Sequence, residues 1–186
     1  MPDVEIDPDR AKRIASRLLY RPRVFCMEWV DPVYCSVHWV PEMVRIAGGV
    51  DELGRRGADS VRISWNDIVQ WAPEVLIVMP CGCGSATAAD QARQLAANPG
   101  WSELPAVRDS RVYAVDANSY FARPGPRLIE GTELLAHLLH PVFFDWTGPS
   151  DAFREVENHR TAKHRGAVNW KAPRGPTVGE PGARSN

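Results

Sequence analysis

Two cysteines separated by one glycine, Cys81 and Cys83, have the spacing that most directly suggests chemistry. Together with Cys35 and His38 they could form a ligand set of thiolates and imidazole, which suits zinc or a softer metal ion. Cys81 could also act as a nucleophile with His38 as its base. The Cys-x-Cys spacing is a weaker signal than the paired Cys-x-x-Cys of zinc sites, and the second pair is missing. A metal- or thiol-dependent protein that uses these four residues is therefore kept as an alternative. The preferred prediction, given below, assigns no metal-binding residues.

The two cysteines follow a continuous apolar run, Glu74 to Val78, that is bounded by prolines. Such a run predicts a strand buried on both faces, as in a parallel sheet. The chain then turns through Gly82 and Gly84 into a helical stretch, 85–97. A strand, a glycine turn and a helix are half a unit of an α/β fold, whose ligands bind beyond the carboxyl ends of the strands. The turn therefore marks a candidate ligand site.

Two further strand ends carry polar and aromatic side chains. One covers 28–32 and continues to 38–39, and the other covers 116–125. Because the carboxyl ends of parallel strands meet at one edge of a sheet, these side chains are expected beside the cysteine turn. A wide aromatic surface with a few fixed polar groups suits a large, flat, partly apolar ligand. The residues expected at this edge are Trp29, His38, Trp39, Tyr120 and Phe121, with Glu28, Asp31 and Arg123 nearby.

The elements that position these residues alternate along the chain. Strands are predicted at 23–29, 74–78 and 111–115, a short extended piece at 61–63, and helices at 8–19, 41–47, 64–72, 85–97 and 126–139. This alternation predicts an α/β fold consisting of a single Rossmann-like lobe, with a mostly parallel sheet and helices on both faces. From Thr147 the chain is rich in Gly, Pro, Arg and Glu, which predicts a disordered C-terminal tail over 147–186 with one helical turn at 151–156.

Composition excludes several classes of protein. The 186 residues, 44% of them hydrophobic, suit one domain with an ordinary core. The net charge of −1 gives no basic field that would attract nucleic acid. No apolar run approaches the ~20 residues that span a bilayer. The acidic N-terminus lacks the apolar segment of a signal peptide, so a complete chain is expected in the cytoplasm.

Catalytic motifs are not found. The sequence contains no Gly-x-Ser-x-Gly elbow and no Gly-x-Gly-x-x-Gly at the start of a helix. The turn at 82–85 lacks the Gly-Lys-Ser/Thr ending of a phosphate loop. We therefore expect a binding protein, not an enzyme, and no cofactor.

A series of motifs in a fixed order resembles a known family. The motifs are Arg21 to Val24, Glu28 to Pro32, His38 to Glu42, Ala47 to Gly49, Ser64-Trp65, Ala72 to Gly82, Trp101 with Leu104 to Val107, Arg111 to Asp116 and Tyr120 to Leu128. In this order they resemble the C-terminal lobe of the cobalamin-binding substrate-binding proteins of ABC importers. That helical-backbone class of periplasmic binding proteins also contains iron–siderophore binders. The resemblance covers roughly 21–141.

The resemblance implies a ligand held between two lobes that a long helix joins. Residues 1–20 would then be the end of that helix, and 21–146 would be the C-terminal lobe. The corrin would lie against aromatic side chains, with Met79 to Gly82 as the floor. The family often carries an acidic residue near the start of this helix that docks on the permease. In this chain that position is Asn66, and the next residue, Asp67, would take the docking role. The implied ligand-binding residues are Glu28, Trp29, Asp31, His38, Trp39, Met79, Pro80, Cys81, Gly82, Asn118, Tyr120, Phe121 and Arg123.

The prediction that follows is the cobalamin- or corrinoid-binding component of an ABC importer, truncated to one lobe. Its partners would be the corrinoid, the permease, and a second lobe or a dimer partner that closes the cleft. Because one wall of the site is encoded, we expect weak corrinoid binding by this chain alone. An iron-chelate binding protein, a metal- or thiol-dependent protein and a gene fragment without a selected function stay open as alternatives. Cobalamin, other corrinoids, haem and iron chelates are not distinguished by the sequence.

Overall fold

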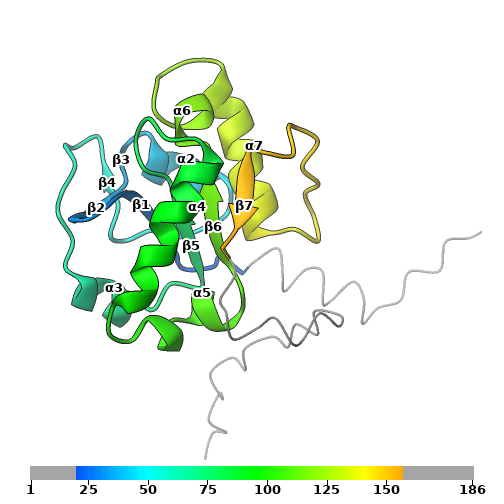
Figure 1. The fold of residues 1–186 in the computed structure, drawn as a ribbon. Coiled ribbons are helices and arrows are strands. Elements are labelled where there is room, and N and C mark those ends of the chain that lie inside the picture. The colour runs from blue at the N-terminus through cyan, green and yellow to red at the C-terminus, as the bar shows by residue number, and fades with distance from the viewer. Residues whose placement is uncertain (1–19, 157–186) are drawn as a thin grey trace, which may run out of the picture.

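A five-stranded sheet organises residues 20–156, the part of the chain that the computed structural model describes (Figure 1). The strand order is β2-β1-β5-β6-β7. The three central strands run parallel, and the two edge strands run antiparallel to their neighbours. The bounds are β1 Val24–Val30, β2 Val33–Cys35, β5 Val75–Val78, β6 Val112–Val115 and β7 Phe153–Glu155. The predicted mostly parallel α/β sheet is confirmed.

Helices cover both faces of this sheet, as predicted. One face packs against α2, Val40–Ile46, α6, Ala117–Tyr120, and α7, Arg127–Leu139. The other face packs against α3, Trp65–Trp71, α4, Ser85–Gln94, and α5, Pro105–Arg108. Strands β5 and β6 and the first four residues of β1 are fully buried because alternate side chains enter the two cores. The remaining short elements are β3 Val37–His38, β4 Arg55–Arg56, η1 Leu95–Ala97 and η2 Trp101–Glu103.

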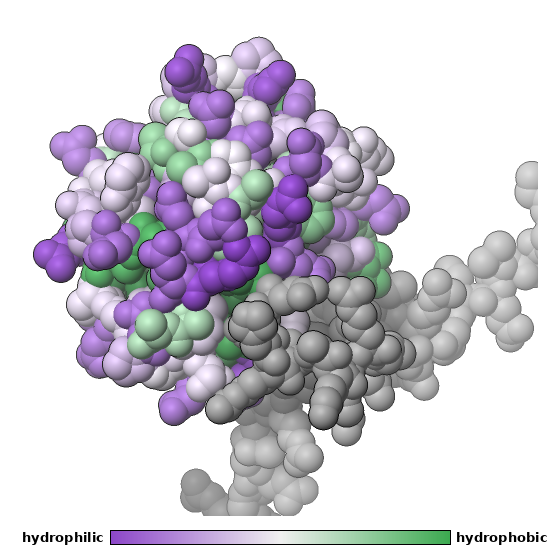
Figure 2. Space-filling model, viewed as in Figure 1, coloured by the Kyte–Doolittle hydropathy of each residue, from purple (hydrophilic) through white to green (hydrophobic). Residues whose placement is uncertain are grey.

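The outer side of the α4 layer is polar. Figure 2, in the same orientation as Figure 1, shows mostly hydrophilic residues on this face, with small and separated hydrophobic areas. On α4 itself the exposed side chains of Asp90 and Arg93 form an ion pair across one helical turn. This surface therefore resembles the solvent-facing side of an ordinary amphipathic helix.

The helices α3 and α4 differ in how closely their ends match the predicted ranges. Ser64 precedes α3, and its hydroxyl accepts the backbone N–H of Asp67 at 3.2 Å and donates to the Asp67 carboxylate at 2.7 Å. Ser64 is therefore the N-cap of α3. The helix predicted over 85–97 is divided, because α4 ends at Gln94 and η1 continues as a 3₁₀ turn.

The prediction of a disordered tail from residue 147 is wrong for its first ten residues. In place of the helical turn expected at 151–156, β7 pairs with β6, and Ala152 and Val156 are buried. Hydrogen bonds to the backbone of β6 hold this segment in place, although its composition alone predicts disorder. The helix predicted at 8–19 and the tail from residue 157 lie outside the described residues.

Gly131 in α7 is expected to be intolerant of a side chain. A Cβ there would lie 2.6 Å from the carbonyl oxygen of Tyr120 and 3.0 Å from Cε of Met43. Helix propensity alone would favour Gly131→Ala by about 1 kcal/mol, but overpacking costs roughly 1–3 kcal/mol. Because the closest atom is backbone, we expect a net loss of about 1 kcal/mol in the free energy of unfolding, measured by urea denaturation.

Gly125→Ala is the matched control for this substitution. Gly125 precedes α7 and has no atom within 4 Å of its Cβ position. We expect that variant to unfold within about 0.5 kcal/mol of the wild type. If Gly131→Ala is as stable as the control or more stable, the space between α7 and the end of α6 can accept a methyl group, and the prediction is wrong.

Candidate functional site

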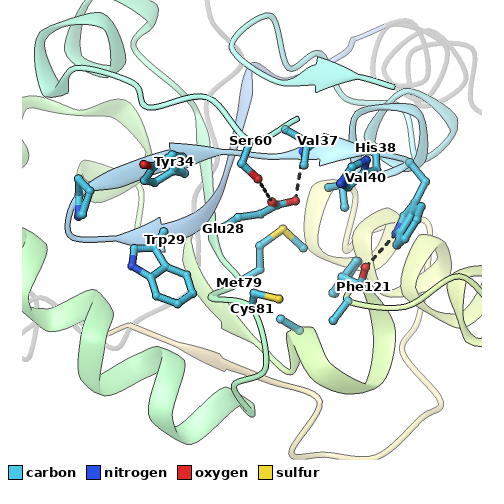
Figure 3. Close-up of a pocket in the computed structure, with 14 residues that line it drawn as sticks. Glu28, Trp29, Tyr34, Val37, His38, Val40, Ser60, Met79, Cys81 and Phe121 are labelled. Atoms are coloured by element: carbon cyan, nitrogen blue, oxygen red, sulfur yellow. Dashed lines mark hydrogen bonds between the residues drawn. The ribbon is translucent and has the colours of Figure 1, made fainter. Parts of the chain in front are cut away.

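A cavity of about 620 Å³ lies at the carboxyl ends of β1, β5 and β6 (Figure 3). Its volume falls within the range of small-molecule sites. Most of its lining is apolar or aromatic, with a carboxylate, an imidazole, hydroxyls and a thiol among it. The lining residues are Glu28, Trp29, Pro32, Tyr34, Val37, His38, Trp39, Val40, Ser60, Met79, Cys81, Ala117, Phe121 and Ala122. The three strand ends that the sequence singled out therefore meet around one hollow.

A β-bulge at the end of β1 brings two consecutive side chains to this cavity. Met27 pairs with Cys35 and Trp29 pairs with Tyr34, so Glu28 has no opposite residue on β2. In a regular strand Glu28 and Trp29 would point to opposite faces of the sheet. The bulge breaks that alternation, and both residues line the cavity. The cross-strand pair of Trp29 and Tyr34 then forms one aromatic wall (Figure 3).

The Glu28 carboxylate is a fixed acceptor in this cavity. It accepts the backbone N–H of Val37 at 3.1 Å and the hydroxyl of Ser60 at 3.4 Å (Figure 3). Burial raises the pKa of Glu28, and the two hydrogen bonds and nearby His38 oppose that rise. An ionised carboxylate has about four acceptor positions. Glu28 can therefore accept further hydrogen bonds from a ligand that carries N–H or O–H groups.

Trp39 joins the other wall of the cavity to the end of α6. Its indole Nε1–H donates to the carbonyl oxygen of Phe121 at 2.8 Å. The His38 ring lies 5.6 Å from the Trp39 ring, centroid to centroid, and His38 is exposed with a left-handed φ of 55°. These contacts hold His38, Trp39 and Phe121 in one continuous wall, although they come from segments about 80 residues apart.

Two sulfur-bearing side chains form the floor. Met79 is 1% exposed, whereas Cys81 is an exposed free thiol. The backbone N–H of Met79 donates to the Met27 carbonyl at 2.9 Å, and that of Cys81 donates to the Glu28 carbonyl at 3.2 Å. The chain after β5 thus stays bonded to β1, which keeps both sulfurs beside Glu28 (Figure 3).

Seven of the expected ligand-binding residues line the cavity: Glu28, Trp29, His38, Trp39, Met79, Cys81 and Phe121. Six others lie outside the lining: Asp31, Pro80, Gly82, Asn118, Tyr120 and Arg123. Tyr120 instead belongs to the core, where its ring packs edge-to-face on Trp146 at 5.9 Å. The ligand-binding role of each cavity residue stays a prediction.

Seven further residues line the cavity that were not among the expected ligand-binding residues: Pro32, Tyr34, Val37, Val40, Ser60, Ala117 and Ala122. Tyr34 had a usable signal, because Asp31 and Pro32 are typical turn residues and a hairpin there would place Tyr34 near Trp29. Ser60 had none, since it lies in an irregular segment that precedes the extended piece predicted at 61–63 and follows no predicted strand.

The four cysteines do not assemble a metal site in residues 20–156. No three or more His, Cys, Asp or Glu side chains in this part of the chain are arranged to hold a metal ion. Cys26 and Cys35 are buried in the two cores, and burial raises the pKa of both thiols. The alternative set of Cys35, His38, Cys81 and Cys83 is therefore wrong, because Cys35 faces the core.

The structure is an α/β lobe with an aromatic cavity at the carboxyl ends of its parallel strands. These two features are typical of ligand-binding lobes. The chain belongs to the periplasmic binding protein family, whose model matches residues 9–119. None of the helices in the described residues is long and apolar enough to cross a bilayer.

Its relatives include an ABC transporter protein. The chain is 38% identical over 76 residues to the uncharacterized ABC transporter substrate-binding lipoprotein YvrC of Bacillus subtilis, which covers 41% of this chain and 24% of YvrC. The cytoplasmic location expected for a complete chain stays a prediction.

Solved structures share the fold. An ABC transporter substrate-binding protein from Listeria monocytogenes has a TM-score of 0.57 at 16% identity, over 72% of this chain and 56% of that one. The periplasmic vitamin B12 binding protein BtuF of Vibrio cholerae has a TM-score of 0.54 at 21% identity, over 73% and 52%. A periplasmic heme binding protein from Pseudomonas aeruginosa has a TM-score of 0.54 at 19% identity, over 72% and 50%. The chain thus spans about half the length of these structures.

Proposed function

We propose that this chain is a ligand-binding lobe of an ABC-importer substrate-binding protein, and that its ligand is cobalamin or a related corrinoid. The observation that carries the proposal is the cavity at the carboxyl edge of the sheet. Trp29 and Tyr34 lie on one side and Phe121 on the other, with Glu28 between them (Figure 3). Trp39 also lines the cavity and is hydrogen-bonded to the Phe121 carbonyl. The family and the similarity to the substrate-binding lipoprotein YvrC support the assignment to an ABC importer, and the fold shared with the vitamin B12 binding protein BtuF supports a corrinoid ligand.

Binding would combine apolar contact with a few hydrogen bonds. A corrin is large and partly apolar, so its faces and edges suit the aromatic walls. Its peripheral amide groups can donate N–H to the Glu28 carboxylate, whose remaining acceptor positions are free of protein donors in the described residues. The protein contributes position and hydrogen bonds, and no bond in the ligand is broken. The activity proposed is therefore binding and delivery, not catalysis.

The importer has two further parts in this proposal. A second lobe, or a second chain, would close the open side of the cavity over the ligand. Asp67 would contact the permease, since its exposed carboxylate lies at the N-terminus of α3 on an exposed turn. The Ser64 hydroxyl already donates to that carboxylate, so docking would use its remaining acceptor positions.

Titration of the purified chain with cyanocobalamin, haem and a ferric siderophore, followed by tryptophan fluorescence, tests the proposal. We expect saturable binding of the corrinoid with a Kd on the order of micromolar, because this lobe by itself buries only part of the ligand. Tighter binding of haem or of the iron chelate would overturn the corrinoid assignment. A failure to bind any of the three would contradict the function itself.

A further inference from the structure

We propose that Glu28 selects corrinoids whose edge carries an amide and rejects ligands that present a carboxylate there, a role that rests on the proposed function. Among the described residues, Glu28 is the acidic side chain of the cavity lining, and neither lysine nor arginine lines the cavity. The lining therefore offers an anionic ligand a negative charge and no guanidinium or ammonium group with which to pair.

The charge of the Glu28 carboxylate is not neutralised by an ion pair within residues 20–156. Its two donors are the backbone N–H of Val37 and the hydroxyl of Ser60, and both are uncharged. His38 lies close enough to favour the ionised form. At pH 8 a carboxyl group is ionised and an imidazole is neutral, so a ligand meets an uncompensated negative charge at this point of the cavity.

The arginines near the cavity do not cancel this charge. Arg56 pairs with Glu42 at 3.1 Å. Arg62 and Arg123 lie within two residues of lining residues in the sequence, but both are exposed and lie outside the lining. Charges that face solvent are screened by salt, whereas a half-buried charge such as that of Glu28 is screened much less. Glu28 therefore dominates the electrostatics of the cavity.

The Glu28 side chain is held in position before a ligand arrives. One carboxylate oxygen accepts the Val37 N–H and the other accepts the Ser60 hydroxyl, and Figure 3 shows the carboxylate between Trp29 and Phe121. With about four acceptor positions on the two oxygens, each oxygen keeps room for one more donor. An N–H group of a ligand would form a charge-assisted hydrogen bond there.

An amide and a carboxylate have opposite effects at this position. The amide NH₂ donates to the carboxylate, whereas an ionised carboxyl of the ligand has no proton to donate and brings a like charge. A fully amidated corrinoid presents amides around its edge. Haem carries propionate groups, and partly amidated corrinoids carry free carboxylates. Glu28 would therefore favour the fully amidated corrinoid over both of these classes of ligand.

The monocarboxylic acids of cyanocobalamin test this selection, because in each isomer one peripheral amide is replaced by a carboxylate. At pH 8 we expect the full chain to bind at least one isomer about 50-fold more weakly than cyanocobalamin. Glu28→Gln should reduce this ratio to about threefold or less, because glutamine keeps the shape of the side chain and its NH₂ can donate to a carboxylate. Titrations followed by tryptophan fluorescence give the Kd values.

Asp31→Asn is the matched control. It removes the same charge three residues further along the chain, but Asp31 is exposed and lies outside the cavity lining. We expect this variant to discriminate between the amide and the carboxylate as wild type does. Binding of cyanocobalamin by Glu28→Gln would show that the variant is folded and that the corrinoid site is intact.

Three outcomes would overturn the selective role of Glu28 and leave the corrinoid site standing. Wild type could bind every isomer as tightly as cyanocobalamin, Glu28→Gln could keep the full discrimination, or Asp31→Asn could lose as much discrimination as Glu28→Gln. If cyanocobalamin binds to none of the three proteins, the proposed function fails and the selectivity fails with it.

Discussion

Replacing Asp51 with alanine will lower the free energy of unfolding by about 3 kcal/mol, because the change leaves several buried donors without an acceptor. One carboxylate oxygen accepts the backbone N–H groups of Leu53 and Gly54 at 3.2 and 2.9 Å. The other accepts the Cys26 N–H at 3.4 Å and the Ser36 hydroxyl at 3.1 Å. Urea denaturation of the two proteins at pH 7 measures the loss.

This carboxylate joins segments that position the cavity. Cys26 lies in β1, two residues before Glu28, and Ser36 is fully buried at the bend between β2 and β3. The Ser36 carbonyl in turn accepts the Arg55 N–H at 2.9 Å. Since β3 leads directly to Trp39, we expect the alanine variant to lose order at the cavity wall as well as stability.

The pH dependence of the same residue has a definite sign. Burial raises the pKa of Asp51 to about 6, above its ordinary value of 3.8. Between those values the folded chain binds a proton that the unfolded chain lacks, so this residue makes the protein more stable as the pH falls from 6 towards 4. The full effect is no more than about 3 kcal/mol.

Asp51→Asn keeps the shape of the side chain and removes the titration. The stability of wild type minus that of Asp51→Asn should therefore grow when denaturation at pH 7 is repeated at pH 5. A difference that shrinks on acidification would show that the four hydrogen bonds to the ionised carboxylate outweigh its burial.

The central sheet and the location of the cavity could be predicted from the sequence. Val75–Val78 contains no polar residue, and only burial on both faces makes such a run favourable. Burial on both faces implies a parallel sheet with helices on each side. Parallel strands end at one edge, and this is why residues that follow three different strands, the aromatic ones among them, lie around one hollow.

The direction of individual side chains could not be predicted. The bulge at Glu28 depends on hydrogen bonds to a partner strand, β2, that the sequence analysis did not identify. Tyr120 and Phe121 are chemically similar neighbours, yet Tyr120 packs on Trp146 in the core and Phe121 lines the cavity. That choice depends on how α6 packs against a distant segment, and no local pattern encodes it.

The order of residues 147–156 shows the same limit at the edge of the sheet. Arg154 and Glu155 in β7 are exposed, so the segment has neither an apolar run nor a clear alternation. Its stability comes from backbone hydrogen bonds to β6, from the Phe153 ring packed edge-on against Tyr113, and from Ala152 and Val156. Composition does not describe backbone pairing or long-range contacts, and it therefore underestimates this strand.

Trp29→Ala is expected to weaken corrinoid binding about 30-fold while leaving stability nearly unchanged. The Trp29 side chain is 48% exposed in the free chain, so folding gains little from its outer half. A flat ligand would cover roughly 100 Å² of that ring, worth about 2 kcal/mol of binding free energy. Cyanocobalamin titration gives the affinity, and urea denaturation gives the stability.

Two further variants decide whether the effect belongs to the cavity. Trp29→Phe keeps an aromatic face beside Tyr34 and should recover most of the lost affinity. Phe144→Ala is the matched control, because Phe144 is 47% exposed but lies outside the cavity lining. If Trp29→Ala weakens binding no more than Phe144→Ala does, the wall of Trp29 and Tyr34 does not contact the ligand. In that case the corrinoid must be held from the opposite wall, where the Trp39 indole is fixed to the Phe121 carbonyl.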